Sequence, residues 1–272
     1  MTVNSYLTSL ASQAIIRDQE KESIARSVAA LGAKISRDFG EDVKEQLIFG
    51  SYSRGTILPR SMDRNSDVDY MLIFSDGGSR PQTYLDRLRR FVERNYVRSA
   101  IKQSHPTIVL SLNHIRFELV PAVESWLEGL QIPAKATDSD RWITTDPTGF
   151  NAQLTNANKS EQNLIKPLVR IVKYWNAHHN YPFASFELEQ KIVIHGFGFF
   201  GLFIEKNLQQ YFFEFMEELE AGIFDPKWKK DAIARTKRII DAAKQHEASL
   251  EFHAAENAIK RLLPPTTRMG LI

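Results

Sequence analysis

The stretch from Ile48 to Phe74, IFGSYSRGTILPRSMDRNSDVDYMLIF, carries the strongest structural signal in the chain. It begins with an apolar run that ends in Gly50–Ser51, continues as a polar loop and ends in DVDYMLIF. In this last segment apolar residues alternate with Asp67 and Asp69, which is the period of a β-strand. Because alternate side chains leave the same face of a strand, we expect both carboxylates on one side of a sheet.

A pair of carboxylates and a glycine–serine turn together predict a site for a metal ion and a phosphate. Asp67 and Asp69 would repel each other strongly unless a cation or a proton lay between them. A hard divalent cation bound by carboxylates and substrate phosphates is the usual solution. Upstream, Gly50 lets backbone N–H groups approach an anion, and Ser51 adds a hydroxyl donor.

A third carboxylate is expected on a neighbouring strand. The segment IRFELV, Ile115 to Val120, alternates apolar residues with Arg116 and Glu118, which predicts a strand with these two side chains on one face. Three carboxylates on adjacent strands suit a two-metal site that activates a hydroxyl and holds a triphosphate. An Asp-x-Asp pair alone is common and mostly solvated, but its combination with Gly50–Ser51 and Glu118 favours a catalytic interpretation.

The pattern of the chain changes near residue 150. Before that point, helical spacing up to Phe39–Gly40 is followed by strands and by a basic helix from Gln82 to Val97. From Ser160 onward almost every segment has helical spacing, including a predicted helix from Phe186 to Glu205. The sequence therefore predicts an α+β protein with two lobes. Residues 1–150 form a lobe with a mixed sheet and N-terminal helices, and residues 151–272 form an all-helical lobe.

Composition excludes several classes of site. The chain of 272 residues has 35 Lys and Arg against 33 Asp and Glu, a net charge of +2, and it has no cysteine. Disulfides, thiolate zinc sites, iron–sulfur clusters and cysteine nucleophiles are therefore excluded. No apolar run has the length of a signal peptide or a membrane helix, so we expect a cytoplasmic protein without a membrane contact. The basic residues Arg87, Arg90, Arg94 and Arg98 form a stripe that is typical of a solvated helix face.

Three motifs resemble a known family. The set of Gly50–Ser51, Asp67, Asp69 and Glu118 resembles the DNA polymerase beta-type nucleotidyltransferase superfamily. Three motifs narrow this resemblance: residues 50–56, GSYSRGT, residues 118–122, ELVPA, and residues 171–176, IVKYWN. Within it they are similar to the bacterial cyclic-oligonucleotide synthases of anti-phage signalling, the CD-NTases related to cyclic GMP-AMP synthase. The resemblance extends over roughly residues 5–262, and the loop between Ser51 and Asp67 is a few residues longer than is usual there.

The resemblance implies a role for each motif residue. It implies a polymerase-beta-like fold, a Mg²⁺ or Mn²⁺ cofactor, and a nucleotide contact by Gly50 and Ser51. The catalytic and metal-binding residues that it implies are Asp67, Asp69 and Glu118. The family's donor-triphosphate lysine and serine match Lys173 in VKYWN and Ser185 in PFASFELE. A lysine on a helix would neutralise phosphate charge; the alternative for Lys173 is a solvated helix residue.

The resemblance also implies an activity. The enzyme would join ATP or other NTPs into a cyclic di- or oligonucleotide second messenger for antiviral defence and release pyrophosphate. ATP and other NTPs are the expected partners, together with an activating nucleic acid or protein that the sequence does not identify. We expect the chain to act as a monomer.

Three other functions remain open on the sequence. The same fold could add CCA or poly(A) tails to RNA, although the chain reaches Ile272 without a recognisable RNA-binding extension. It could transfer AMP to a protein or a small molecule. It could also be a catalytically silent nucleotide sensor, but a silent site has no need to hold Asp67, Asp69 and Glu118 against their mutual repulsion.

Overall fold

The computed structural model describes residues 2–104, 106–134, 138, 140–197 and 206–266. The packing of the chain divides it into two compact units. Unit 1 consists of Met1–Ile15, Ser61–Arg64 and Ala152–Ile272, and unit 2 consists of Ile16–Arg60 and Asn65–Asn151. Two short pieces of the predicted lobe 1–150 thus pack with the C-terminal helices.

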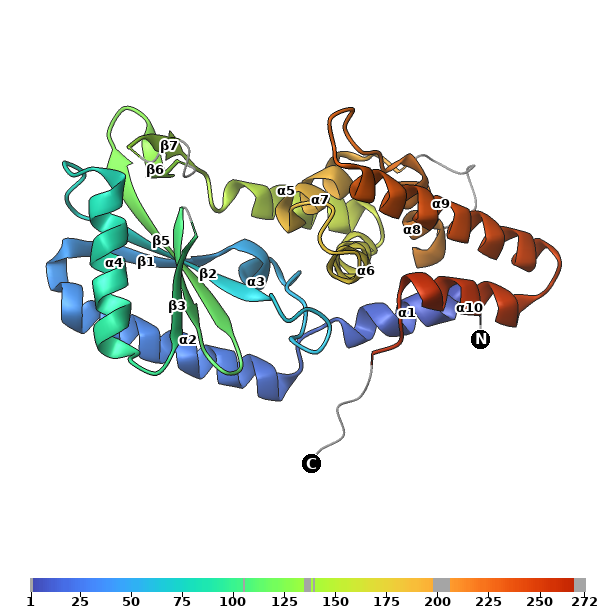
Figure 1. The fold of residues 1–272 in the computed structure, drawn as a ribbon, viewed down its shortest axis with the longest axis horizontal. Helices are drawn as coiled ribbons and strands as arrows, with labels where there is room; N and C mark the ends of the chain where they lie inside the picture. The colour runs from blue at the N-terminus through green and yellow to red at the C-terminus, as the bar shows by residue number, and fades with distance from the viewer. Residues whose placement is uncertain (1, 105, 135–137, 139, 198–205, 267–272) are drawn as a thin grey trace. The chain divides into compact units, whose positions relative to one another are not determined.

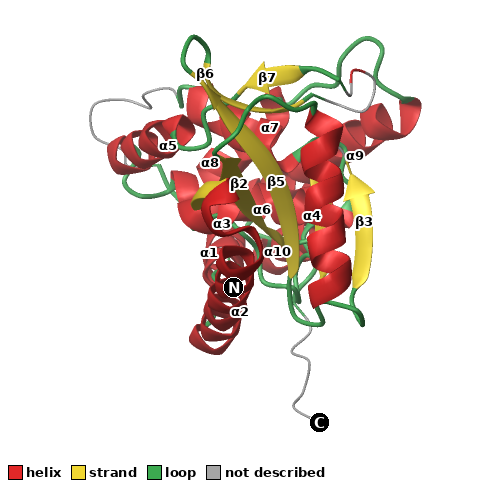
Figure 2. Cartoon of the chain, turned by 90° about the vertical axis from the view of Figure 1, so that its left-hand side faces the viewer, coloured by secondary structure: helices red, strands yellow, loops and turns green. Residues whose placement is uncertain are grey.

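Unit 2 is built on a mixed sheet, and its strands in the described chain are β1 (Val43–Phe49), β2 (Asp67–Phe74), β3 (Ala100–Ser104), β4 (Thr107–Ser111), β5 (Arg116–Ser125), β6 (Gly129–Pro133) and β7 (Trp142–Thr144). The strand order is β1-β2-β5-β4-β3, and β6 pairs with both β5 and β7. β2 and β5 run parallel, whereas the other pairs are antiparallel. Figure 2 shows β2 and β5 side by side. The predicted α+β class is confirmed.

The helices of unit 2 are α2 (Asp18–Phe39), α3 (Gly50–Arg54) and α4 (Pro81–Asn95), with a 3₁₀ turn at Gly40–Asp42. Helix α2 buries Ile24, Leu31 and Ile35, whose spacing of seven and four residues places them on one stripe. It ends at Gly40, which has a φ of 53°. A residue with a side chain is disfavoured in that backbone region, so glycine ends the helix there, as the sequence predicts.

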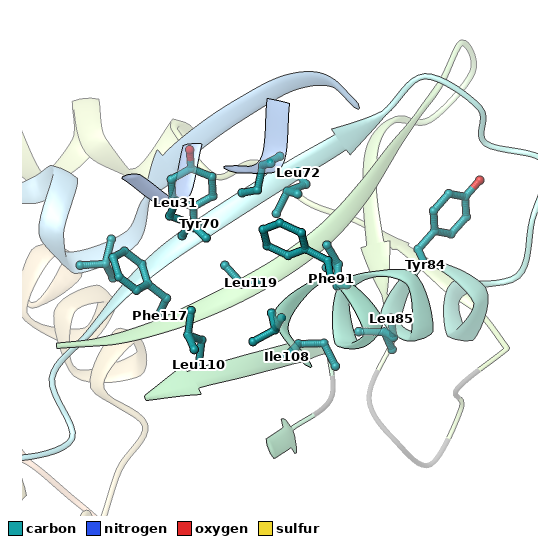
Figure 3. Packing of buried hydrophobic residues seen from close by; sticks show 14 of the residues in the cluster. Leu31, Tyr70, Leu72, Tyr84, Leu85, Phe91, Ile108, Leu110, Phe117 and Leu119 are labelled. Atoms are coloured by element: carbon teal, nitrogen blue, oxygen red, sulfur yellow. The ribbon is translucent and has the colours of Figure 1, made fainter. Parts of the chain in front are cut away.

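The two faces of the central strands differ in character. On one face Tyr70 and Leu72 of β2 and Phe117 and Leu119 of β5 belong to the core that α2 and α4 cover, which includes Phe91 (Figure 3). The opposite face carries the other alternate residues of both strands. Toward the strand ends these residues form a small apolar cluster of Met71, Ile73, Val120 and Ala122. Where the two strands begin, the same face carries charged residues instead.

Unit 1 contains the helices α1 (Val3–Gln13), α6 (Ile165–His178), α7 (Ser185–Ile194), α8 (Leu208–Glu218), α9 (Lys227–Ala248) and α10 (Phe252–Leu262), and most of α5 (Gly149–Ser160) (Figure 1). Its described residues contain no strand. Helix α7 ends at Ile194, so it is shorter than the predicted helix, and residues 198–205 of that prediction lie outside the described residues.

The N-terminal helical pattern is divided between the two units. Helix α1 buries Val3, Leu7 and Leu10, and it packs on α6, α8 and α10 of unit 1. Tyr6 on the same helix donates a hydrogen bond to the carbonyl of Leu263, with 2.5 Å between the oxygens. Helix α2 packs instead in unit 2. The apolar stripe of α1 is completed by helices from the far end of the chain, which helical spacing alone does not reveal.

No helix in the described residues is both long enough and apolar enough to cross a membrane.

Candidate active site

The pairing of three strands brings the predicted carboxylates together. In the parallel pair of β2 and β5, Asp69 lies beside Glu118 and Asp67 lies beside Arg116. On the other side of β2, Phe49 at the end of β1 lies opposite Asp69. Because Asp67, Asp69 and Glu118 occupy alternate positions, all three lie on the face opposite the α2–α4 core. Their catalytic role stays a prediction, but their juxtaposition is a property of the fold.

Gly50 is packed directly against one of these carboxylates. Its φ is 70°, and a β-carbon built there would lie 1.8 Å from Oδ2 of Asp69. Both facts disfavour any other residue, because such a φ is strained for L-residues and atoms cannot approach to that distance. The sequence predicts Gly50 as part of a phosphate cradle. The structure adds that its missing side chain makes room for Asp69.

Ser51 lies in the short helix α3, immediately after β1. Its backbone carbonyl accepts hydrogen bonds from the N–H groups of Thr56, at 2.9 Å, and Ile57, at 3.1 Å. These bonds fix the turn that follows α3, where Gly55 has a φ of 70°. Within the described residues the Ser51 hydroxyl has no hydrogen-bond partner. It therefore suits the predicted role of donating to a bound phosphate.

Arg116 lies among the carboxylates, although its sequence pattern predicts no role for it. One terminal nitrogen, Nη2, lies 2.5 Å from Oδ2 of Asp67 and 3.6 Å from Oε1 of Glu118. The side chains of all three residues are about a quarter exposed. The strand period already placed Arg116 on the face of Glu118. Only the parallel register with β2 shows that Asp67 is the anionic partner of Arg116.

The environment of Glu118 changes its acidity. Burial and, to a smaller extent, the negative charge of Asp67 raise the pKa of Glu118 to about 7, while the nearby charge of Arg116 opposes the change. A carboxyl group with such a pKa binds a proton near neutral pH unless another cation replaces it. The three carboxylates therefore carry more negative charge than Arg116 alone neutralises.

The donor chemistry fits the predicted metal. Carboxylate oxygens are the ligands that Mg²⁺ and Mn²⁺ prefer, and the negative charge of Asp67 adds to the effect of burial in raising the pKa of Glu118. In the described part of the chain, however, no group of three or more His, Cys, Asp or Glu residues is arranged so that it could hold a metal ion. Instead Asp67 is paired with Arg116. Binding of a cation by all three carboxylates would therefore require their side chains to turn.

The predicted nucleotide-binding lysine forms a buried ion pair in unit 1. Nζ of Lys173 on α6 lies 3.1 Å from Oε1 of Glu189 on α7, and the two side chains are 6% and 1% exposed. The alternative that Lys173 is a solvated helix residue is therefore wrong. Ser185 begins α7 and precedes Glu189 by four residues, so it lies one turn away on the same face of the helix. Nucleotide binding by Lys173 and Ser185 stays a prediction.

Asn176 positions the segment between these two helices, and the sequence analysis assigned it no role. It is fully buried, and its Nδ2 donates to the carbonyl of Phe183 at 2.9 Å. The N–H of Phe183 donates back to Oδ1 of Asn176 at 3.1 Å. The asparagine of IVKYWN thus fixes the chain two residues before Ser185. Its neighbour Trp175 is fully buried and donates to Thr236, so it belongs to the core as predicted.

Comparisons with known proteins identify the family of the chain. Residues 1–158 match the model of the Second Messenger Oligonucleotide or Dinucleotide Synthetase domain. A probable cyclic nucleotide synthase of Bacillus cereus is 25% identical, and the alignment covers 68% of this chain and 66% of that protein. The chain thus spans slightly less than two thirds of the length of this curated relative.

Solved structures show the same fold. CdnC of E. coli MS115-1 with ATP has a TM-score of 0.68 at 15% identity, with 98% of this chain and 99% of that chain covered. DncV of Vibrio cholerae in its 3′-deoxy GTP bound form has a TM-score of 0.73 at 11% identity, with 97% and 96% covered. The resemblance predicted from the sequence is confirmed. Because the family model matches more than half of the chain, this protein belongs to the Second Messenger Oligonucleotide or Dinucleotide Synthetase family.

Proposed function

We propose that the protein is a metal-dependent nucleotidyltransferase that joins NTPs into a cyclic di- or oligonucleotide and releases pyrophosphate. The observation that carries this proposal is the placement of Asp69 beside Glu118, with Asp67 on the same face and Gly50 against Asp69. Membership of a second-messenger synthetase family supports it. The matched structures include CdnC with ATP and DncV with 3′-deoxy GTP, and we propose NTPs as the substrates of this protein.

The residues of the chain divide the work as follows. Gly50 leaves the space that Asp69 occupies, and the hydroxyl of Ser51 donates to a phosphate oxygen. Arg116 holds Asp67 in place and offsets part of the negative charge. When bound, Mg²⁺ or Mn²⁺ held by Asp67, Asp69 and Glu118 would lower the pKa of an attacking hydroxyl and stabilise charge on pyrophosphate.

Glu118 links the binding of a metal ion at the site to the release of a proton. Without a bound cation, its pKa of about 7 leaves it substantially protonated at neutral pH. Ligands must be deprotonated to bind a metal, so loading of the site should release this proton. In unit 1, Lys173 and Ser185 are proposed to bind the donor triphosphate, and Lys173 would exchange its contact with Glu189 for phosphate oxygens.

The test is a single incubation of the purified protein with mixed NTPs and MgCl₂, followed by phosphatase treatment and chromatography with mass analysis. A phosphatase-resistant cyclic product is expected, and Asp69→Asn should not form it. A tailed RNA in a parallel reaction with added tRNA, or AMP attached to protein, would instead identify one of the alternative acceptors. The absence of any product from all NTP mixtures with either Mg²⁺ or Mn²⁺ would contradict the proposal.

The biological setting is a further part of the proposal. We infer that the product acts as a second messenger in antiviral defence, in the cytoplasm, since that is the setting that the family resemblance implies. An activating nucleic acid or protein and a monomeric state remain predictions. Comparing product formation with and without added nucleic acid would test the first, and sedimentation of the purified chain would test the second.

A further inference from the structure

A hollow on the surface of unit 1 is lined by three arginines. Arg235 and Arg238 on α9 and Arg261 on α10 surround it, and Ile239 and Ala242 complete its lining. We call this feature the arginine hollow. Helices α9 and α10 form an antiparallel pair, joined by a short turn, and lie side by side (Figure 1). The hollow has a volume of about 300 Å³, at the lower end of the range for small-ligand sites.

The helix geometry explains why the three side chains meet. Arg235, Arg238, Ile239 and Ala242 are spaced by three and four residues, which places them on one stripe of α9. Arg261 lies near the end of α10, which returns along α9 toward this stripe. The three arginines are exposed and Ile239 between the helices is buried, so the guanidinium groups are accessible to a ligand that approaches from solvent.

The positive charge of the arginine hollow is not balanced by acidic side chains. Within the described residues, none of its three arginines forms an ion pair or a hydrogen bond with an acidic side chain, although Asp231 and Asp241 lie on the same helix. Arginine does not lose its proton in proteins, so deprotonation cannot relieve the repulsion among the three groups. A bound anion can.

Other cations of unit 1 contrast with this arrangement. Lys229 is paired with Asp225 at 2.8 Å, and Lys260 is paired with Glu256 at 2.7 Å. Lys244 is likewise paired, with Glu217. These neighbours do not extend the uncompensated charge of the hollow along the helices. Lys227 and Lys237 on α9 form no ion pair within the described residues, but neither lines the hollow. A nucleic-acid surface would use these lysines as well, since it needs a track of positive charge that follows a backbone.

The positive charge of Arg235 also affects a neighbouring histidine, His179. The pKa of His179 is lowered first by its burial, and the charge of Arg235 lowers it further. His179 follows α6 directly, so the field of Arg235 reaches the neighbouring helix.

We propose that the arginine hollow binds a compact anion with linked phosphate groups, the di- or triphosphate part of a small molecule. Arginine suits this ligand because its planar fork donates two hydrogen bonds to one phosphate. The site lies on α9 and α10 and includes none of the residues assigned to nucleotidyl transfer. It is therefore a second phosphate site, and it does not depend on the proposed function.

The test measures binding without turnover. Tripolyphosphate and ATP are titrated separately by calorimetry into the full chain, in EDTA and at about 0.15 M salt, where weak surface attraction is screened. The variant Arg238→Gln with Arg261→Gln should lose at least about tenfold in affinity for tripolyphosphate. The control Lys227→Gln with Lys237→Gln removes equal charge from α9, outside the hollow, and should stay within about twofold. All four changes are at residues outside the fully buried core, and thermal melting verifies that both variants fold.

The two ligands distinguish the source of the phosphates. Equal affinity for ATP and tripolyphosphate would mean that the hollow recognises the phosphates alone, and tighter binding of ATP would mean that it also recognises a nucleoside. An equal loss in both variants, or no loss in the arginine variant, would overturn the proposal. So would tighter binding of a short single-stranded RNA that both variants weaken equally, because that result assigns the surface to nucleic acid.

Discussion

On the β2–β5 face, like charges lie together with partial access to water, whereas between α6 and α7 opposite charges are buried as a pair. Asp67 and Glu118 share a neighbouring cation, Arg116, and burial and the charge of Asp67 raise the pKa of Glu118. Lys173 and Glu189, by contrast, are almost completely buried and neutralise each other. Both regions are predicted to bind parts of one substrate, and they would do so from different charge states.

The two regions differ in the contacts that a bound ligand would have to replace. A divalent cation entering the carboxylate face supplies charge that the fold leaves unbalanced. A triphosphate reaching Lys173 must compete with Glu189, because the lysine already has a charged partner. Removing one residue should therefore mainly abolish chemistry in the first region and mainly destabilise the fold in the second.

The largest effect is expected from Asp69→Asn. The change removes a carboxylate that is needed for metal-assisted activation, so the rate of product formation should fall at least about a thousandfold. Its melting temperature should hold or rise, because repulsion from Glu118 is relieved. Asp241→Asn, on the exposed side of α9, is the matched control. A rate above a tenth of wild type would contradict the assignment.

Asp67→Asn separates catalysis from pairing within the same site. It should lose activity to a similar extent, but it also removes the partner of Arg116. Its melting temperature should therefore lie below that of Asp69→Asn. Equal melting temperatures would show that the ion pair between Asp67 and Arg116 contributes nothing measurable, as many exposed pairs do.

The buried pair should respond in stability. Lys173→Met leaves Glu189 buried without its cation, and loss of one partner of such a pair costs about 3–5 kcal/mol in the free energy of unfolding. Urea denaturation measures this loss. The double variant Lys173→Met with Glu189→Leu should recover most of it, because apolar side chains can replace a buried pair. If the double variant is stable and its KM for NTP is unchanged, Lys173 has no part in nucleotide binding.

Two glycines with the same backbone conformation test the packing against Asp69. Gly50 and Gly55 both have a φ of 70°, but only at Gly50 would a β-carbon collide with a carboxylate. Gly55→Ala adds backbone strain of about 1–2 kcal/mol. Gly50→Ala must also displace Asp69, and a misplacement of about 1 Å at a reactive group costs about a hundredfold in rate. Equal rates for the two variants would show that Gly50 does not position Asp69.

The smallest effect is a dependence of stability on pH. The pKa of Glu118 is about 7 in the folded protein, against its ordinary value of 4.5. Between pH 4.5 and pH 7 the folded state therefore binds more protons than the unfolded state. Stability should therefore fall as pH rises from 4.5 to 7. With allowance for the partial exposure of Glu118, this change in protonation contributes about 2 kcal/mol to the free energy of unfolding. Urea denaturation in EDTA at pH 5 and pH 8 measures the change. Glu118→Gln should remove that part of it, and an identical dependence in the variant would rule out Glu118 as its source.

Local sequence was sufficient for the elements that carry the site. The alternation in DVDYMLIF and IRFELV predicted two strands and the face on which Asp67, Asp69 and Glu118 lie, because strand period is a local property of the backbone. The helical spacing from Ser160 onward likewise predicted the helices of unit 1, and α6 buries Leu168, Ile171 and Trp175. Glycine at position 50 was recognised from its turn, since few other residues suit such a conformation.

Contacts between distant segments decided the rest. The parallel register of β2 and β5 set Arg116 beside Asp67, and the packing of α7 on α6 buried Lys173 against Glu189. The position of α1 in unit 1 depends on helices at the other end of the chain. The period of a strand or helix predicts the face on which a side chain lies, but it does not predict which residues that face contacts. Register, burial and charge partners depend on residues far apart in sequence, so only the tertiary structure could determine them.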